Sequence, residues 1–155
     1  MQIKLRNHYL VPLIPFLQGM KLKGERSRAR SKFLALATAA YASLHESELE
    51  LVKEYAELDA GGNPQTDEKG GFSLREDAAI HEYLVERDKL FNEVAEIEGG
   101  TYTAHLALMR QILTEYDEDL DGENAALYDA LCDAFEEGGL PTEHAGSTDD
   151  TERRT

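Results

Sequence analysis

A long stretch of helical spacing constrains most strongly what this chain can fold into. Between residues 34 and 58, apolar side chains recur at alternating steps of three and four, and the repeat is interrupted at Glu48. This spacing places the apolar side chains on one side of an α-helix, where they pack against other helices. The pattern predicts one long helix from about Glu25 to about Ala60, with a seam made of Leu34, Ala37, Tyr41, Leu44, Leu51, Tyr55 and Leu58.

A second helix is expected from about Leu74 to Glu98. Ser73 and Glu76 have the spacing of a capping box, which opens many helices. The apolar repeat that follows is interrupted at Arg87. The side chains expected to face the core are Ile80, Tyr83, Leu84, Leu90, Phe91, Val94 and Ile97.

Two shorter helical patterns complete the C-terminal half. One runs to about Tyr116 and carries Leu106, Met109, Ile112, Leu113 and Tyr116. The other follows Asp121, a good N-cap residue, and ends at Gly138 and Gly139. Its expected inward-facing residues are Leu127, Ala130, Leu131, Ala134 and Phe135.

The N-terminus predicts a short strand followed by a short helix. Gln2 to Arg6 alternates polar and apolar residues, as a half-buried strand does. Gly71 to Leu74 is its preferred partner, ahead of Gly100 to Thr103. Asn7 could cap a helix through Leu17, in which Pro12 and Pro15 predict a kink or a break.

These patterns predict a mainly α fold, an antiparallel helical bundle around one long helix with a small N-terminal β element. A chain of 155 residues can bury one such core without a disulfide or a metal. We expect a single domain over residues 1–139. Residues 140–155 are small, polar and acidic without periodicity, which predicts a disordered tail.

The net charge of −15 is unevenly distributed along the chain. Residues 1–32 sum to +7, and residues 33–155 sum to −22. The basic part contains a candidate contact for a partner or a phosphate, made of Lys21, Lys23, Arg26, Arg28, Arg30 and Lys32. Bases at a helix N-terminus oppose the helix dipole, so acids from later elements are expected to lie over them. The alternative is a docking site for phosphate or for an acidic protein.

The acidic part contains a candidate interaction surface made of Glu46, Glu50, Glu54, Glu57, Asp117 and Asp119. Charged residues usually cover a solvated helix face, and solubility explains most of them. An acidic field of this extent could also attract a basic partner, or mimic a phosphate backbone toward a DNA-binding protein. A general DNA-coating role is disfavoured because the acidic part would repel phosphate.

No motif for catalysis, metal binding or a cofactor emerges. Asp117, Asp119 and Asp121 imitate the first half of a calcium loop, but Tyr128 stands where the bidentate Glu is needed. The two His-Glu pairs lack the second His of the helical zinc motif. Acids near Cys132 would raise its thiol pKa. We therefore expect no enzyme, no metal and no cofactor.

Several segments together resemble a family of small uncharacterised proteins of tailed phages and prophages of Gram-positive bacteria. The matching segments are 21–33, 54–59 with 62–64, 98–100 and 116–136. Pro12 and Pro15 depart from the pattern of that family. The resemblance implies a phage setting and a roughly helical fold, and it implies no catalytic residue.

The function expected from these observations is that of a phage accessory protein acting by protein–protein interaction, in virion or tail assembly or in modulating the host. The alternative is an acidic DNA mimic that inhibits a host nucleic-acid-binding defence protein. The longest apolar run is too short to span a membrane, and no secretory signal is evident. The expected location is the host cytoplasm, with association to the virion and a homo-oligomer both left open.

Overall fold

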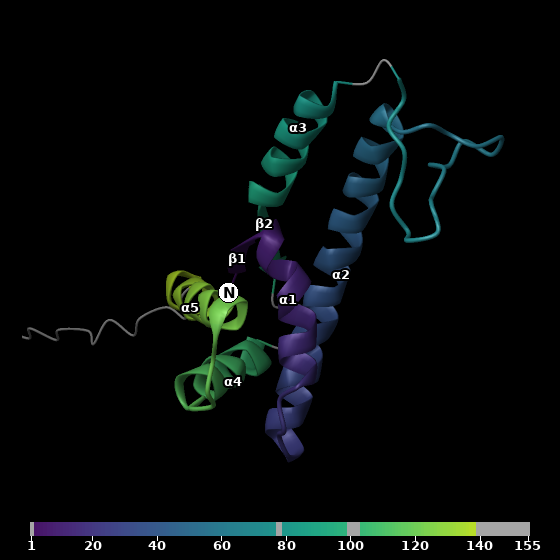
Figure 1. Ribbon diagram of the computed structural model, residues 1–155. Helices are drawn as coiled ribbons and strands as arrows, with labels where there is room; N and C mark the ends of the chain where they lie inside the picture. Colours follow the sequence, from purple (N-terminus) through teal and green to yellow (C-terminus); the bar gives the residue numbers. More distant parts are fainter. Residues whose placement is uncertain (1, 77–78, 99–102, 139–155) are drawn as a thin grey trace, which may run out of the picture.

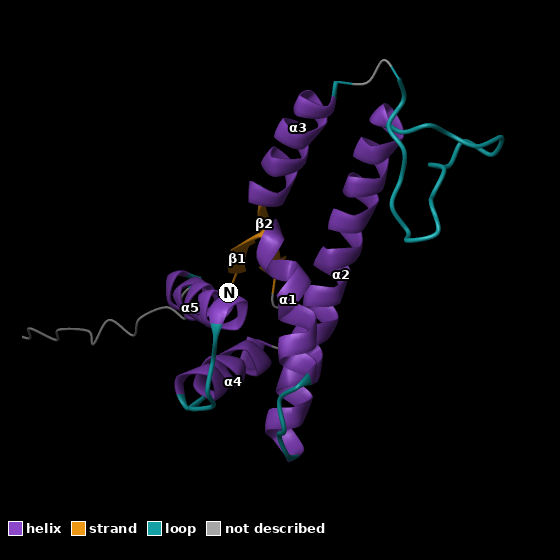
Figure 2. Ribbon diagram, viewed as in Figure 1, coloured by secondary structure: helices purple, strands orange, loops and turns teal. Residues whose placement is uncertain are grey.

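The longest element of the fold is helix α2, against which much of the remaining chain packs. The computed structural model describes residues 2–76, 79–98 and 103–138 (Figure 1). In chain order the elements are β1 Gln2–Arg6, α1 Asn7–Gln18, α2 Gly24–Tyr55, α3 Ile80–Asn92, β2 Val94–Glu98, α4 Thr103–Thr114 and α5 Gly122–Glu137. The prediction of a mainly α fold with one long helix and a small β element is confirmed (Figure 2).

The helices are arranged around α2 in two ways. Helices α1 and α3 lie alongside α2 and run in the opposite direction, as Figure 1 shows. Helices α4 and α5 cross the direction of α2 near its N-terminal half, and α5 also packs against α1 and β1. The antiparallel arrangement is thus seen for α1 and α3, whereas α4 and α5 form a separate crossing layer.

Helix α2 begins where the sequence predicted and ends five residues earlier. Ala56 leaves the helix because its backbone pairs with Leu74 in an isolated antiparallel bridge. Leu58, expected on the helical seam, therefore lies in the following loop with 42% of its surface exposed. The rest of the expected seam packs as predicted, and Leu44 is only 4% exposed.

Glu48 and Arg87, the charged residues that interrupt the apolar repeats of the two predicted helices, lie close to each other. Arg87 of α3 lies with a guanidinium nitrogen 3.7 Å from a carboxylate oxygen of Glu48 on α2. The Arg87 guanidinium also covers the Phe91 ring, 4.3 Å from its centroid. Two charged residues can occupy an otherwise apolar seam because each partly neutralises the other at the edge of the helix pair.

The two-stranded sheet pairs β1 with β2, so the preferred partner, Gly71 to Leu74, was wrong. Most of the other candidate, Gly100 to Thr103, lies outside the described residues. The antiparallel register places Ile3 opposite Ile97 and Lys4 opposite Glu96. Ile3 and Ile97 are 0% and 3% exposed, so the buried face of the sheet is apolar. The helical spacing of Val94 and Ile97 misled the prediction, because residues 94–98 also alternate as a strand does.

Helix α3 is much shorter than the helix predicted over residues 74–98. It begins at Ile80, and the predicted capping box at Ser73 and Glu76 does not open it. The Ser73 carbonyl instead accepts a hydrogen bond from the Glu57 amide, at 2.8 Å. Long-range backbone pairing thus overrode a local helical preference.

Several side chains predicted for the core on this segment are exposed. Ile80, Leu84 and Val94 are 59%, 54% and 54% exposed. Tyr83 is buried at 8%, whereas Leu90 and Phe91 are half-buried beside the main core. The apolar pattern of α3 is therefore wider than the face that α2 covers.

Helix α1 passes continuously through Pro12 and Pro15. The predicted cap by Asn7 is wrong, because no side-chain hydrogen bond caps this helix. The Asn7 side chain instead donates to the Leu90 carbonyl at 2.9 Å, and its backbone amide donates to the Glu93 carbonyl at 2.9 Å. Asn7 thus ties the start of α1 to the end of α3.

Helices α4 and α5 confirm most of the predicted inward-facing residues. Leu106, Met109, Ile112 and Leu113 on α4 are buried. On α5, Leu127, Leu131, Ala134 and Phe135 are buried, whereas Ala130 is half-buried. Asp121 occupies the N-cap position of α5 without a side-chain capping bond, and α4 ends before Tyr116.

The buried residues form a large core and a small separate cluster. The large core joins β1, α1, α2 as far as Leu44, β2, α4 and α5. In it the Phe33 and Phe135 rings meet edge-on, with centroids 5.3 Å apart. The small cluster contains Val52, Ala56 and Tyr83 at the far end of α2. The two clusters divide the molecule into a body and a projecting part.

We call this projecting part, residues 46–89, the arm. It contains the C-terminal end of α2, the connection that follows and most of α3 (Figure 1). In the connection, Asp59 and Asp67 each accept two backbone hydrogen bonds through Oδ1, which closes two similar turns. Gly62 and Gly70 supply positive φ angles of 80° and 79° in these turns.

The predicted tail of residues 140–155 lies outside the described residues. Among the described helices, none has the length and apolar character required to cross a lipid bilayer.

Candidate functional site

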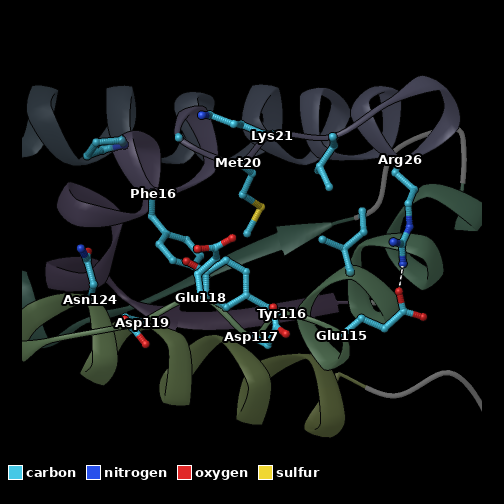
Figure 3. A pocket seen from close by; sticks show the side chains of 14 residues that line it. Phe16, Met20, Lys21, Arg26, Glu115, Tyr116, Asp117, Glu118, Asp119 and Asn124 are labelled. Carbon is cyan, nitrogen blue, oxygen red and sulfur yellow. Dashed lines mark hydrogen bonds and ion pairs between the residues drawn. The ribbon is translucent and has the colours of Figure 1, made fainter.

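A pocket lies where the connection from α1 to α2 meets the connection from α4 to α5 (Figure 3). Its volume is about 620 Å³. The first connection contributes Met20, Lys21 and Leu22, and the second contributes Tyr116 and a run of acids. Two segments almost 100 positions apart in the sequence therefore line one cavity.

Aromatic rings form one wall of the pocket. The rings of Phe16 and Tyr116 are tilted with centroids 5.5 Å apart, and Tyr128 lies behind Tyr116 at 5.4 Å. The Tyr128 hydroxyl donates to the Leu113 carbonyl at 2.6 Å. Burial, followed by the neighbouring Cys132, raises the pKa of Tyr128 to about 12. This wall is held by α4 and α5 together.

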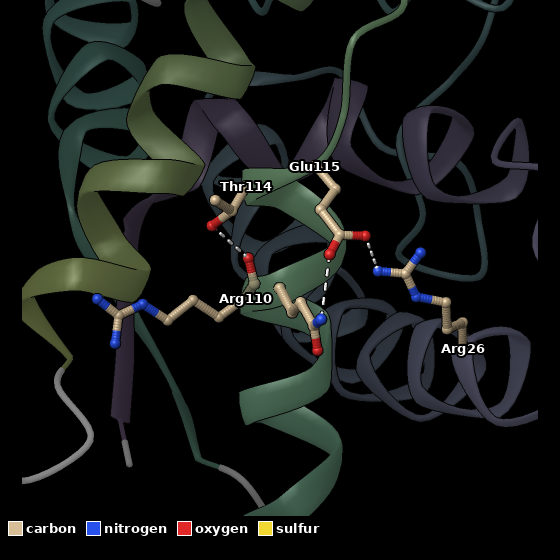
Figure 4. Close-up of polar contacts among 5 residues, drawn as sticks. Arg26, Arg110, Thr114 and Glu115 are labelled. Carbon is tan, nitrogen blue, oxygen red and sulfur yellow. Dashed lines mark hydrogen bonds and ion pairs between the residues drawn. The ribbon is translucent and has the colours of Figure 1, made fainter.

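An ion pair between Arg26 and Glu115 closes one end of the pocket (Figure 4). Gln111 donates to the other Glu115 oxygen at 3.0 Å. The hydrogen bond from Arg26, followed by that from Gln111, lowers the pKa of the Glu115 carboxyl. For Arg26, the expectation that a later acid lies over the basic segment is confirmed.

Arg30 is occupied by the backbone rather than by an acid. Its guanidinium donates to the carbonyl oxygens of Leu17 and Met20, at 3.1 and 2.7 Å. These carbonyls lie at the end of α1, where helical partners are missing. Arg30 therefore fixes the connection that forms the floor of the pocket.

The remaining bases of the predicted contact do not form one surface. Lys21 lines the pocket and is exposed. Lys23, Arg28 and Lys32 are also exposed, but they are not among the lining residues within the described part of the chain. The six predicted bases are thus divided between internal contacts, the pocket and the open surface.

The predicted acidic surface is divided in the same way. Asp117 and Asp119 line the pocket together with Glu118. The other four predicted acids are exposed on α2 and just beyond it, in the arm: Glu46, Glu50, Glu54 and Glu57. The structure therefore brings Asp117 and Asp119 near Lys21 and Arg26, an association that the sequence did not indicate.

The lining of the pocket combines aromatic rings, carboxylates and the bases Lys21 and Arg26. The described lining residues include neither His nor Cys, and burial raises the pKa of the nearby Cys132 thiol. Among the described residues, no group of three or more His, Cys, Asp or Glu is placed to hold a metal ion. Aromatic faces next to carboxylates suit a cationic side chain.

Two features of this site escaped the sequence interpretation. Tyr116 was expected at the end of a core helix, but it lies after α4 and lines the pocket. Phe16 was not singled out at all. The only local signal was an aromatic residue next to an acidic run, and such residues are common at helix ends.

Comparison with known proteins gives a family for the chain but no activity. No curated protein matches the chain, and no solved structure does. A match to a protein family covers residues 1–140, which includes every described element. The chain therefore belongs to the family described as "Protein of unknown function (DUF1617)".

Proposed function

We propose that this protein is a non-enzymatic phage accessory protein that works by binding another protein. The partner belongs either to virion or tail assembly or to the host, in whose cytoplasm the protein acts. The resemblance of its sequence segments to proteins of tailed phages and prophages supports the phage setting. The charge and apolar exposure of the arm support the mode of action.

The observation that carries this proposal is the mixed surface of the arm. Large apolar side chains there are exposed among acids, with Leu84 and Ile80 more than half exposed. Residues 46–89 hold thirteen Asp or Glu against five Lys or Arg, a net charge of −8. Apolar contacts contribute affinity for a partner, whereas the charges contribute specificity and a faster association rate.

Affinity capture of the full tagged chain from infected cells tests the proposal. We expect one protein to be recovered reproducibly, and to bind directly when both are purified. An unrelated acidic protein with the same tag is the control for charge alone. Failure of every recovered protein to bind directly would contradict the proposal.

The second candidate is an acidic mimic of DNA. The observation that favours it is the row of Glu46, Glu50, Glu54 and Glu57, which are exposed and make no ion pair among those identified in the described residues. A mimic would displace DNA from a host DNA-binding protein in a gel-shift competition. Recovery of virion proteins alone in the capture experiment would remove this candidate.

If the protein has a role in assembly, its oligomeric state can be predicted. A symmetric building block should form a stable oligomer whose mass light scattering can measure at several salt concentrations. A monomer at every protein concentration would count against that form of the proposal, and would leave binding to another protein intact.

A further inference from the structure

Exposed apolar side chains collect in the arm. Seven large hydrophobic residues are exposed in the described part of the chain. Five of them lie in the arm: Leu49 at 39%, Leu58 at 42%, Ile80 at 59%, Leu84 at 54% and Val85 at 38%. The other two, Val11 and Val94, lie in the body on different elements. The arm therefore has apolar surface that the fold leaves uncovered.

Ile80 and Leu84 form a stripe on α3 that α2 does not cover. They are four positions apart, so they lie on the same side of the helix, one turn from each other. The buried residue of this helix is Tyr83, which packs edge-on against Tyr55 and Phe72 at 5.6 and 5.5 Å. The stripe lies next to this contact and is open to solvent.

The stripe continues toward the body through Arg87 and Phe91. These residues follow Leu84 at steps of three and seven, which keeps them close to the same side of α3. Phe91 is half-buried, and Arg87 covers its ring and reaches Glu48. Arg87 and the half-burial of Phe91 therefore close the C-terminal end of the stripe, while the end at Ile80 and Leu84 stays open.

The charge around the stripe indicates what can cover it. Glu82 and Asp88 on α3 are exposed, and so are Glu46, Glu50 and Glu54 on the neighbouring α2. A second copy of this chain would bring two arms of net charge −8 together, which opposes pairing. The sequence of residues 139–155 has a net charge of −2 and no apolar repeat, so it offers neither an excess of bases nor apolar side chains at the spacing of the stripe.

We propose that the α3 stripe binds an amphipathic helix of another protein, with Leu or Ile facing Ile80 and Leu84 and with Lys or Arg on its flanks. Apolar side chains on such a helix recur at steps of three and four and would lie against the stripe. The basic flanks would meet the acids of the arm. This proposal rests on the proposed protein-binding function and specifies the surface and the chemistry of the partner.

A designed peptide tests the surface without knowledge of the partner. The probe is a synthetic helix of Leu, Ala and Lys, with Leu at steps of three and four, added to the full-length protein and followed by fluorescence anisotropy. The double variant Ile80→Gln/Leu84→Gln should weaken binding about tenfold or more, because it removes the apolar contact and keeps the charge. Both positions are exposed, so we expect the fold to persist.

The matched control is Val11→Gln/Val94→Gln, which replaces two comparably exposed side chains, at 47% and 54%, outside the arm. It should bind the probe like the unchanged protein. A second peptide with Glu in place of Lys should not bind. Amide chemical-shift changes on adding the Lys peptide should be centred on α3. Equal loss in both double variants, or shift changes centred on the body, would overturn the proposal.

Two further outcomes separate this proposal from the proposed function. If the protein dimerises and Ile80→Gln/Leu84→Gln abolishes the dimer, a second copy covers the stripe and the proposal is wrong. If this double variant captures the same direct binding protein with unchanged affinity, the protein-binding function stands and the α3 stripe is not its surface. If the unchanged chain has no direct binding protein, the proposed function itself fails.

Discussion

At the residue scale, Gly138, just after α5, has the least space for a side chain among the described glycines. A Cβ atom at this position would lie 2.2 Å from the carbonyl oxygen of Gln2 in β1. That distance is far inside van der Waals contact, so a larger residue must push the end of α5 away from the sheet. Gly138 is thus required by packing, although its φ of −70° suits any residue.

Gly138→Ala is therefore expected to destabilise the protein by about 1–3 kcal/mol, as overpacking of a close contact does. Urea unfolding followed by circular dichroism measures the change. The control is Gly19→Ala, whose added Cβ would find its nearest atom at 3.4 Å, an ordinary contact. Equal stability of the two variants would show that β1 and α5 can separate freely.

The pKa of Tyr128 predicts a loss of stability at alkaline pH. Folding raises this pKa to about 12 from its ordinary value of 10, because the buried phenol keeps its proton. The unfolded state then binds fewer protons than the folded state between these values, so this contribution is complete below pH 10 and is lost as the pH rises toward 12.

Tyr128→Phe tests this linkage. At neutral pH the variant should lose about 1 kcal/mol with its hydrogen bond to Leu113. Between pH 10 and 12 its stability should fall less steeply than that of the unchanged protein. Urea unfolding across this pH range gives both quantities. If stability falls with pH equally steeply in both proteins, Tyr128 is not the group that causes the alkaline loss.

At the scale of elements, the polar contact between α2 and α3 lies between the small cluster around Tyr83 and the part of α3 that packs against the large core. Glu48 and Arg87 are 31% and 42% exposed, so water screens their ion pair. Arg87 also covers Phe91. Because Arg87 contacts Phe91 as well as Glu48, the two charged residues should not contribute equally to the pairing of the helices.

A double-mutant cycle of Glu48→Gln and Arg87→Gln should give a coupling of about 0.2–1 kcal/mol, as expected for a partly exposed pair. Arg87→Gln alone should cost more than Glu48→Gln, because it also removes the cation–π contact. Glu50→Gln, at an exposed position of α2 two residues from Glu48, is the control. Additive single effects would mean that the ion pair contributes nothing to stability.

At the scale of the whole molecule, the separation into a body and an arm predicts two levels of stability. The body contains the large core, whereas the arm depends on the few side chains packed around Tyr83. Small clusters open locally at a lower free energy than the whole protein. The arm should therefore exchange its amide protons before the body does.

Hydrogen exchange followed by mass spectrometry measures this difference. Tyr83→Ala should speed exchange in α3 and the end of α2 while leaving α5 unchanged. Phe33→Ala, which removes a ring from the large core, should cost about 3–5 kcal/mol and speed exchange throughout. Uniform acceleration by Tyr83→Ala would mean that the arm and the body unfold as one unit.

The candidate site shows why the two charged segments could not be assigned from sequence. Arg26 and Glu115 are 89 positions apart, and nothing local indicates that they meet. Arg30 looks like any other base of its segment, but it binds backbone carbonyls at the end of α1. A charge has a role only through the group that lies opposite it, and that group comes from the packing of distant elements.

The sequence by itself determined that the chain is mainly helical, where α2 begins, that residues 2–6 alternate as a strand, and most of the buried residues of α4 and α5. These properties depend on spacing within one element, so they can be found locally. Only the tertiary structure decided that β1 pairs with residues 94–98, that Glu48 meets Arg87, and that Ile80 and Leu84 remain exposed. Each of these depends on a contact, or on the lack of one, between segments far apart in the chain, and an apolar pattern is the same whether or not another element covers it.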